Sequence, residues 1–148
     1  MSSTYLALYY HLVFSTNNRE PSIGSEWRSR LHEYLGGTVN RLGGQSLGVG
    51  GTNDHVHLLV ELKATHGLAD FVRELKKASS SWVRDEISSA AFAWQKGYAA
   101  LTVSASVVPT VRTYIENQDG HHRQMSFRDE VLTLLRRSGV EVDERYFD

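Results

Sequence analysis

The segment HVHLLVEL, at residues 55–62, constrains the fold most strongly because its side chains alternate in character. Successive side chains of a β-strand point to opposite faces, so His55 and His57 lie on the same face. The opposite face is apolar enough to pack on a core and carries Val56, Leu58 and Val60. This pattern predicts a strand with one face on a hydrophobic core and two imidazoles on the other face.

The remaining apolar and turn-forming residues predict strands and helices around this segment. In chain order, we expect a strand at residues 5–16, a helix at 25–42, strands at 45–51 and 55–62, a helix at 68–86 and a strand at 91–104 that breaks near Gly97. The order β-α-β-β-α-β is that of the ferredoxin-like fold, in which one antiparallel sheet carries two helices on one face. A chain of 148 residues fits one core, so we predict a single α+β domain over residues 1–148.

Two more helices are expected after this order is complete. The first spans residues 107–118, with Ser106 as its N-cap and Pro109 in its first turn, where proline is tolerated. The second begins with Ser126 and Asp129 as a capping pair. These C-terminal helices add to the ferredoxin-like unit, and the first of them carries Tyr-Ile-Glu-Asn-Gln near its end.

The composition excludes several classes of protein. The chain has no cysteine, which rules out disulfides, thiolate-metal sites and a cysteine nucleophile. Its start has no signal-peptide pattern, and no apolar run approaches the ~20 residues of a membrane helix. We therefore expect a soluble, cytoplasmic protein without membrane contact. The chain also lacks the phosphate-binding G-x-x-x-x-G-K-[ST] motif, so no nucleotide cofactor is expected.

The net charge is −1, but basic residues gather in the predicted helix at residues 68–86. Residues 71–84 contain one acid, Glu74, and four basic residues: Arg73, Lys76, Lys77 and Arg84. A local basic face suits contact with phosphate groups. A solvated helix face explains the same pattern without any partner. These four basic residues are the predicted phosphate contacts, and the resemblance described below implies that the phosphates are those of DNA.

Two groups of residues could carry chemistry. His55 and His57 can reach a single metal ion from one strand face, although a surface or hydrogen-bonded pair has the same spacing. Tyr114 and Gln118 are four residues apart on a predicted helix and therefore share a face. Tyr114 could equally be the polar edge of the apolar stripe that docks this helix on the sheet. Neither group alone decides between these alternatives.

Three segments together resemble the single-tyrosine HUH transposases of small bacterial insertion sequences of the 200/605 type, in which U is a bulky apolar residue. The segments are YHLVFST at residues 10–16, GTNDHVHLLV at 51–60, and YIENQ at 114–118, which is followed by HHR at 121–123. Their order and spacing are those of the family, and the resemblance extends over about residues 5–147. The REP-associated tyrosine transposases, a domesticated branch, are similar as well.

The resemblance implies a role for each residue of the two groups. His55 and His57 match two ligands of a divalent ion, Mg²⁺ or Mn²⁺, Gln118 matches the third ligand, and Tyr114 matches the nucleophile. The implied substrate is single-stranded DNA with hairpins at the ends of a mobile element, and the implied assembly is a homodimer. Attack by the tyrosine gives a 5′-phosphotyrosine and a free 3′-hydroxyl, and a later 3′-hydroxyl attack rejoins the strands.

Two other functions remain open on the sequence alone. One is a domesticated or non-catalytic protein that binds DNA hairpins, and the other is an unrelated metalloprotein such as a hydrolase of small phosphoesters. His11 lies in an apolar strand, where a core or hydrogen-bonded role is expected. His121 and His122 could approach the phosphate or cap the preceding helix, and neither is predicted to be a ligand. The sequence does not identify the proton acceptor for Tyr114.

Overall fold

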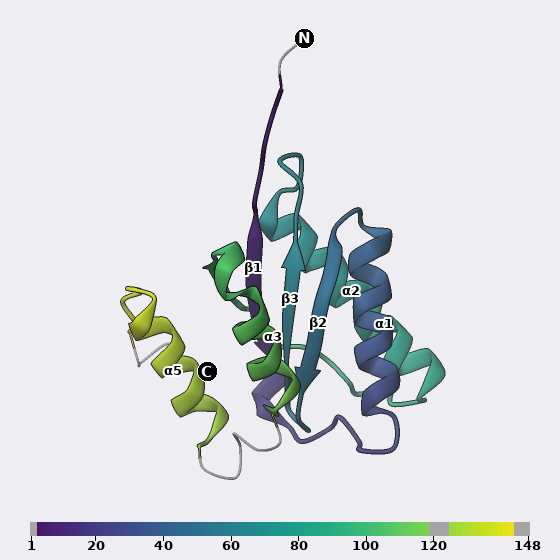
Figure 1. The fold of residues 1–148 in the computed structure, drawn as a ribbon. Helices are drawn as coiled ribbons and strands as arrows, with labels where there is room; N and C mark the ends of the chain where they lie inside the picture. The colour runs from purple at the N-terminus through teal and green to yellow at the C-terminus, as the bar shows by residue number, and fades with distance from the viewer. Residues whose placement is uncertain (1–2, 119–124, 144–148) are drawn as a thin grey trace.

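The computed structural model describes residues 3–118 and 125–143. Its centre is a four-stranded sheet in the order β2-β3-β1-β4 (Figure 1). All three pairings are antiparallel. The strands are β1 (Tyr9–Ser15), β2 (Gln45–Gly51), β3 (His55–Glu61) and β4 (Ala99–Val103). This topology confirms the predicted α+β, ferredoxin-like sheet, with β1 and β3 as its central strands.

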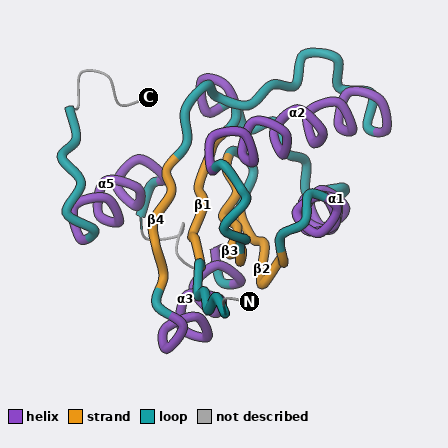
Figure 2. Tube along the Cα trace, turned by 90° about the horizontal axis from the view of Figure 1, so that it is seen from above, coloured by secondary structure: helices purple, strands orange, loops and turns teal. Residues whose placement is uncertain are grey.

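Helices cover both faces of the sheet. The four α-helices in the described residues are α1 (Arg28–Arg41), α2 (Leu68–Glu86), α3 (Val108–Glu116) and α5 (Phe127–Arg137). As predicted, α1 and α2 lie together on one face, whereas the added helices α3 and α5 lie on the other side of the strands (Figure 2). No helix in the described part of the chain combines the length and apolar character needed to span a bilayer.

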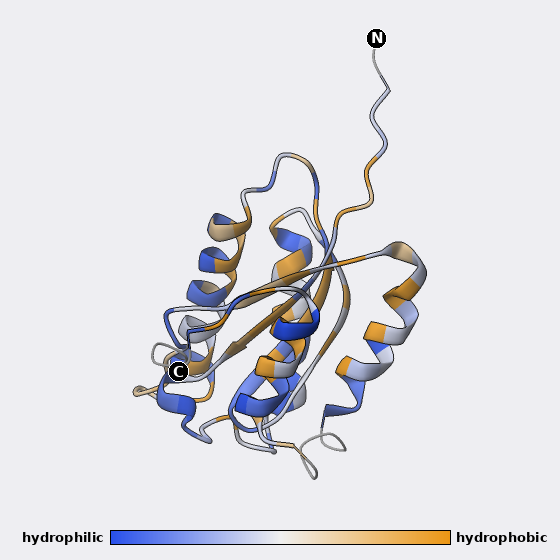
Figure 3. Ribbon diagram, turned by 90° about the vertical axis from the view of Figure 1, so that its left-hand side faces the viewer, coloured by the Kyte–Doolittle hydropathy of each residue, from blue (hydrophilic) through white to orange (hydrophobic). Residues whose placement is uncertain are grey.

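The main hydrophobic core fills the space between the sheet and the pair α1 and α2. It includes the three alternate residues of β3 that the sequence assigned to the core side. The other strands and the two helices contribute Leu12, Phe14, Leu35, Val39, Phe71, Leu75 and Val83. In Figure 3 the helices show hydrophobic and hydrophilic segments in alternation, as expected of helices with one side on a core. The predicted inward face of β3 is therefore confirmed, and its histidines lie on the opposite face.

The first and last strands are shorter than predicted. β1 begins at Tyr9, and the chain before it runs away from the sheet as an extended arm (Figure 1). In the predicted strand at residues 91–104, regular pairing begins at Ala99, and Trp94 forms an isolated bridge with Thr16. The indole of Trp94 is fixed from the helix side, because its Nε1 donates to Ser79 Oγ at 2.9 Å. This segment is therefore held by α2 before it joins the sheet.

The two predicted helix caps have different outcomes. Ser126 is confirmed as the N-cap of α5, because its Oγ accepts from the backbone N–H of Asp129 at 3.2 Å. Ser106 is wrong as the N-cap of α3, because it lies inside a 3₁₀ turn, η2 (Ala105–Val107), and Val107 takes the cap position without a side-chain hydrogen bond. Pro109 does lie in the first turn of α3.

Candidate metal centre

β3 places His55 and His57 on the face of the sheet that α3 and α5 cover. Both side chains are fully buried. β3 runs between β1 and β2, where His57 lies opposite Val13 on one side and Gly50 on the other. Their location in a central strand gives both imidazoles a fixed backbone on each side.

The glycines of β2 explain why α3 can lie directly on this face. A Cβ built at Gly50 would lie 2.0 Å from the backbone oxygen of Ile115, so no side chain fits between the strand and the helix. At Gly48 the nearest atom to such a Cβ is Arg112 Cγ, at 3.4 Å. Ile115 itself is fully buried. Backbone contact at Gly50 therefore sets the distance between α3 and the sheet, and with it the depth of Tyr114.

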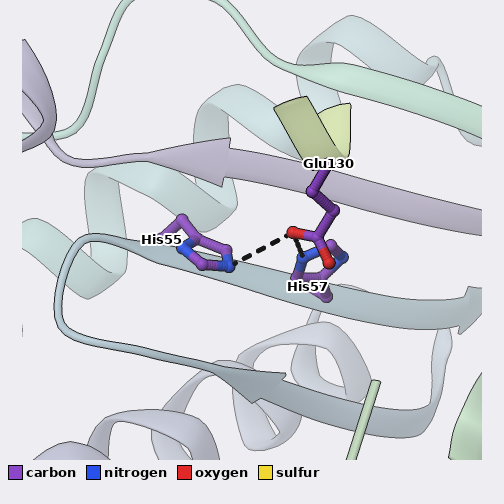
Figure 4. Close-up of side chains that lie close together, drawn as sticks. All are labelled: His55, His57 and Glu130. Carbon is purple, nitrogen blue, oxygen red and sulfur yellow. Dashed lines mark hydrogen bonds and ion pairs between the residues drawn. The ribbon is translucent and has the colours of Figure 1, made fainter. Parts of the chain in front are cut away.

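Glu130, on α5, completes a group of three potential metal ligands with the two histidines. One ligand atom from each residue lies within 4.8 Å of the others. The Oε1 atom of Glu130 is 3.1 Å from His57 Nε2 and 3.6 Å from His55 Nε2. Figure 4 shows the carboxylate entering from α5 above the two rings that project from β3. Glu130 is almost completely buried, and a buried carboxylate needs partners such as these imidazoles to offset the loss of hydration.

Sequence reasoning missed Glu130 because its position resembles ordinary helix-capping chemistry. Acidic residues are common in the first turn of a helix, where they interact with the helix dipole. The available signal was that Glu130 shares a side of α5 with Phe127 and Val131, which pack inward, rather than with the exposed residues. An acid among apolar residues of an amphipathic helix indicates a buried partner, but not which one.

Tyr114, in the last turn of α3, and Gln118, two residues beyond the end of α3, both reach this group. Gln118 Oε1 is 3.0 Å from His55 Nε2, and Gln118 Nε2 donates to Glu130 Oε2 at 3.1 Å. The hydroxyl of Tyr114 donates to the same Oε2 atom. The rings of Tyr114 and His57 are 5.9 Å apart between centroids, edge to face. The structure therefore brings together all four residues that the sequence singled out, within one chain.

A second set of residues holds the far side of each imidazole. His55 Nδ1 is 2.8 Å from Asp54 Oδ1 and 3.1 Å from Thr52 Oγ1. The His55 ring also stacks on Phe127, with centroids 4.2 Å apart. His57 Nδ1 is 2.7 Å from Nε2 of His11, which is buried in β1. The expectation that His11 is hydrogen-bonded is confirmed, and its partner is a candidate ligand.

Burial and the nearby carboxylate change the protonation chemistry of two groups. Burial, followed by the hydrogen bond and charge of Glu130, raises the pKa of Tyr114 above its usual value. The charge of Arg137 acts in the opposite direction on the pKa of Tyr114. Burial, with a smaller contribution from His57, lowers the pKa of His11 to about 3. His11 is therefore a neutral imidazole at physiological pH.

The donor atoms fit a hard or borderline divalent cation. Two imidazole nitrogens converge with one carboxylate oxygen and one amide oxygen. Oxygen donors suit Mg²⁺ and Mn²⁺, and imidazole is a ligand of borderline ions such as Fe²⁺, Ni²⁺ and Zn²⁺. Because His55, His57 and Glu130 are buried, water screens the electrostatic interactions between them less than it would at the surface. The arrangement therefore has the chemistry of a divalent-metal site.

The four predicted DNA contacts lie on α2, across the sheet from this centre. Three of them have partners within the protein: Arg73 pairs with Asp70 at 2.8 Å, Lys76 donates to the carbonyl of Gln95 at 2.9 Å, and Arg84 donates to that of Phe92 at 3.3 Å. Lys77 is exposed. Contact of these four residues with DNA stays a prediction. A DNA strand bound at the histidines would have to pass around the edge of the sheet to reach α2. His121 and His122 lie outside the described residues.

Comparisons with known proteins agree with the fold. The sequence model described as transposase IS200 like matches residues 4–118, so the chain belongs to the IS200-like transposase family. Among curated proteins, the ISDra2 transposase TnpA of Deinococcus radiodurans is 27% identical over 118 residues, which make up 75% of this chain and 84% of the relative.

Two solved structures have a similar fold. A candidate transposase from Deinococcus radiodurans, known from a crystal structure, is 27% identical and matches with a TM-score of 0.62 over 80% of this chain and 96% of that one. The REP-associated tyrosine transposase, solved with a bound REP hairpin, matches with a TM-score of 0.54 and 13% identity over 78% of this chain and 70% of that one. At 13% identity the second likeness concerns the fold alone.

Proposed function

We propose that this protein is a metal-dependent DNA strand transferase that cleaves and rejoins single-stranded DNA at hairpin-bearing ends. Tyr114 is the nucleophile, and His55 and His57 hold a divalent ion together with oxygens of Glu130 and Gln118. Membership of the IS200-like transposase family supports the class of reaction. The observation that carries the proposal is the hydrogen bond from the Tyr114 hydroxyl to Glu130, the carboxylate that also contacts both histidines.

Tyr114 and Glu130 have different roles in the cleavage step. The Tyr114 oxygen forms a bond to phosphorus as the bond from phosphorus to the 3′-oxygen breaks. The departing 3′-oxygen takes up a proton from water, which gives a 5′-phosphotyrosine and a free 3′-hydroxyl. The hydroxyl proton of Tyr114 points to Glu130 Oε2, which is the nearest carboxylate oxygen and is placed to receive it. The reverse exchange, with a 3′-hydroxyl attacking the phosphotyrosine, rejoins the strands. One phosphodiester replaces another, so no nucleotide cofactor is required.

The ion, when bound, would polarise the scissile phosphate and offset the charge that develops in the transition state. His55 and His57 would hold it through their Nε2 atoms, which both face the Glu130 carboxylate. α3 holds Tyr114 in position through its contact with β2. A homodimer would provide two such tyrosines for the two ends of an element.

The alternative is a domesticated relative that binds hairpins without cleaving them. The REP-associated tyrosine transposase has been solved with a bound REP hairpin and shares this fold. The raised pKa of Tyr114 favours this alternative, because a protonated phenol is a weak nucleophile. The two functions differ in whether Tyr114 loses its proton and attacks when metal and DNA are bound.

The decisive experiment is a cleavage assay on single-stranded oligonucleotides that fold into short imperfect hairpins, beginning with any palindromes found beside the gene. With Mn²⁺ or Mg²⁺, we expect a covalent protein–DNA band that survives denaturation. Tyr114→Phe should remove the band while hairpin binding continues. Tyr34→Phe is the matched control, because Tyr34 stacks on Trp82 on the far side of the sheet. An adduct that persists in Tyr114→Phe contradicts the assignment, and hairpin binding by the wild type without any adduct supports the alternative.

A further inference from the structure

His11 and His57 form a contact between two imidazoles that lies behind the candidate metal centre. His11 Nε2 is 2.7 Å from His57 Nδ1, and both residues are buried. The other ring nitrogen of His57, Nε2, is 3.1 Å from Glu130 Oε1 on the side of the centre. His11 also meets the Tyr114 ring edge to face, with centroids 6.2 Å apart. The His57 ring is therefore held at both nitrogens, and the partner of Nδ1 is another imidazole.

Metal binding imposes one protonation pattern on this pair. A neutral imidazole carries one proton, and a nitrogen that binds a metal must offer its lone pair instead. When His57 Nε2 faces the ion, the proton of His57 is on Nδ1, which must donate it. The atom 2.7 Å away is His11 Nε2, so it must accept. His11 then carries its own proton on Nδ1.

We infer that His11 is a positioning residue that fixes the orientation and tautomer of His57 for metal binding, an inference that rests on the metal site of the proposed function. An imidazole is suited to this place because its Nε2 atom can donate or accept. Without an ion, His57 Nε2–H donates to Glu130 and His11 Nε2–H donates to His57 Nδ1. With an ion, the direction of the hydrogen bond between the two rings reverses.

The two candidate ligands have different supporting partners. His55 Nδ1 is 2.8 Å from the carboxylate of Asp54, which can only accept while it is ionised. His57 relies on a neutral partner that can change its role. Such partners of metal-bound histidines fix the ring and raise its basicity. A purely structural His11 would satisfy a buried hydrogen bond but would not affect metal affinity, which makes the two roles separable.

The test compares His11→Leu with His11→Gln in full-length protein without DNA. Leucine fills a similar volume but cannot accept, whereas a glutamine side chain reaches a similar place with an oxygen that can. Leu101→Val is the matched control, because Leu101 is buried and lies opposite His11 in β4. Mn²⁺ affinity is measured by electron paramagnetic resonance of the free ion. Long-range ¹⁵N spectra of the Zn²⁺-loaded protein report which nitrogen of His57 carries the proton.

We expect His11→Leu to weaken Mn²⁺ binding about 10- to 100-fold, in line with other residues that support metal ligands. His11→Gln should restore most of the affinity, and Leu101→Val should leave it unchanged. The Zn²⁺-loaded wild type should show the His57 proton on Nδ1. Unchanged affinity in His11→Leu, a proton on Nε2, or no metal binding by the wild type overturns the inference. Formation of the Tyr114 adduct by the wild type is measured separately. If the wild type forms the adduct but His11→Leu binds Mn²⁺ with unchanged affinity, only this inference is rejected. If His11→Leu loses Mn²⁺ affinity but the wild type forms no adduct, only the proposed reaction is rejected.

Discussion

The Tyr114 hydroxyl donates a hydrogen bond to Glu130, a residue on a different helix and 16 positions further along the chain. The same carboxylate contacts both histidines of β3 and the amide of Gln118. Glu130 is thus the point at which the candidate nucleophile and the candidate metal ligands meet. Its side chain can serve as a ligand to the ion or as an acceptor for the tyrosine proton, and its two oxygens face these two tasks separately.

Neutralising Glu130 should impair both metal binding and acceptance of the tyrosine proton. We expect Glu130→Gln to lower Mn²⁺ affinity and to slow formation of the tyrosine adduct, each by at least about tenfold. Because Glu130 raises the pKa of Tyr114, the same substitution should also lower that pKa, which ultraviolet titration of the phenol can follow. Glu141→Gln, at an exposed position, is the control. Wild-type affinity and adduct rate in Glu130→Gln would show that the carboxylate has no part in the site.

Substitutions at two glycines of β2 should have very different effects. Gly50→Ala places a Cβ against the backbone oxygen of Ile115, so α3 must shift. We expect a loss of about 1–3 kcal/mol in the free energy of unfolding, as for other overpacked sites, together with loss of adduct formation. Gly48→Ala meets only Arg112 Cγ at 3.4 Å, a contact that a flexible side chain can relieve. Chemical denaturation and the cleavage assay measure both effects, and equal effects of the two substitutions would contradict the backbone contact.

Stability at mildly acidic pH should depend on His11. Burial lowers its pKa from 6.5 to about 3, so below pH 6.5 the unfolded chain binds a proton that the folded protein does not. The wild type should therefore lose stability relative to His11→Gln as the pH falls from 6.5 toward 3. Urea denaturation of the two proteins across this range measures the difference. A difference that stays constant with pH would mean that His11 titrates normally in the folded state.

Divalent ions should stabilise the folded protein, because the candidate ligands come from different elements of the fold. An ion at about 100 times its dissociation constant adds about 2.7 kcal/mol to the free energy of unfolding if it binds only the native state. Thermal denaturation with increasing Mn²⁺ should show a rising Tm, which a chelator reverses. His57→Ala should abolish the rise, whereas His66→Ala, at a histidine on the loop before α2, should retain it. A similar rise in both variants would place the ion elsewhere.

How far the sequence could predict this site differs from residue to residue. The alternation in β3 predicted the shared face of His55 and His57, because strand geometry has a fixed period of two. Helical spacing predicted that Tyr114 and Gln118 share a face of one helix, but α3 ends at Glu116, so Gln118 reaches the site from beyond the helix end. Glu130 could not be predicted, since its place at the histidines depends on how α5 packs, and sequence periodicity says nothing about that packing. The hydrogen bond from the Lys76 ammonium to the carbonyl of Gln95 also depends on tertiary structure and could not be read from the charge pattern, and contact of Lys76 with DNA stays a prediction.

The contact between Gly50 and Ile115 also limits how this protein can be altered. Most helices rest on a sheet through side chains, so their height can be changed by exchanging one side chain for a larger or smaller one. α3 rests on β2 through the main chain of Gly50, so the strand offers no side chain to exchange at this point. An engineer who wishes to reposition the tyrosine can move it along α3 or extend the turn before the helix. Raising or lowering the helix itself would require rebuilding the strand beneath it.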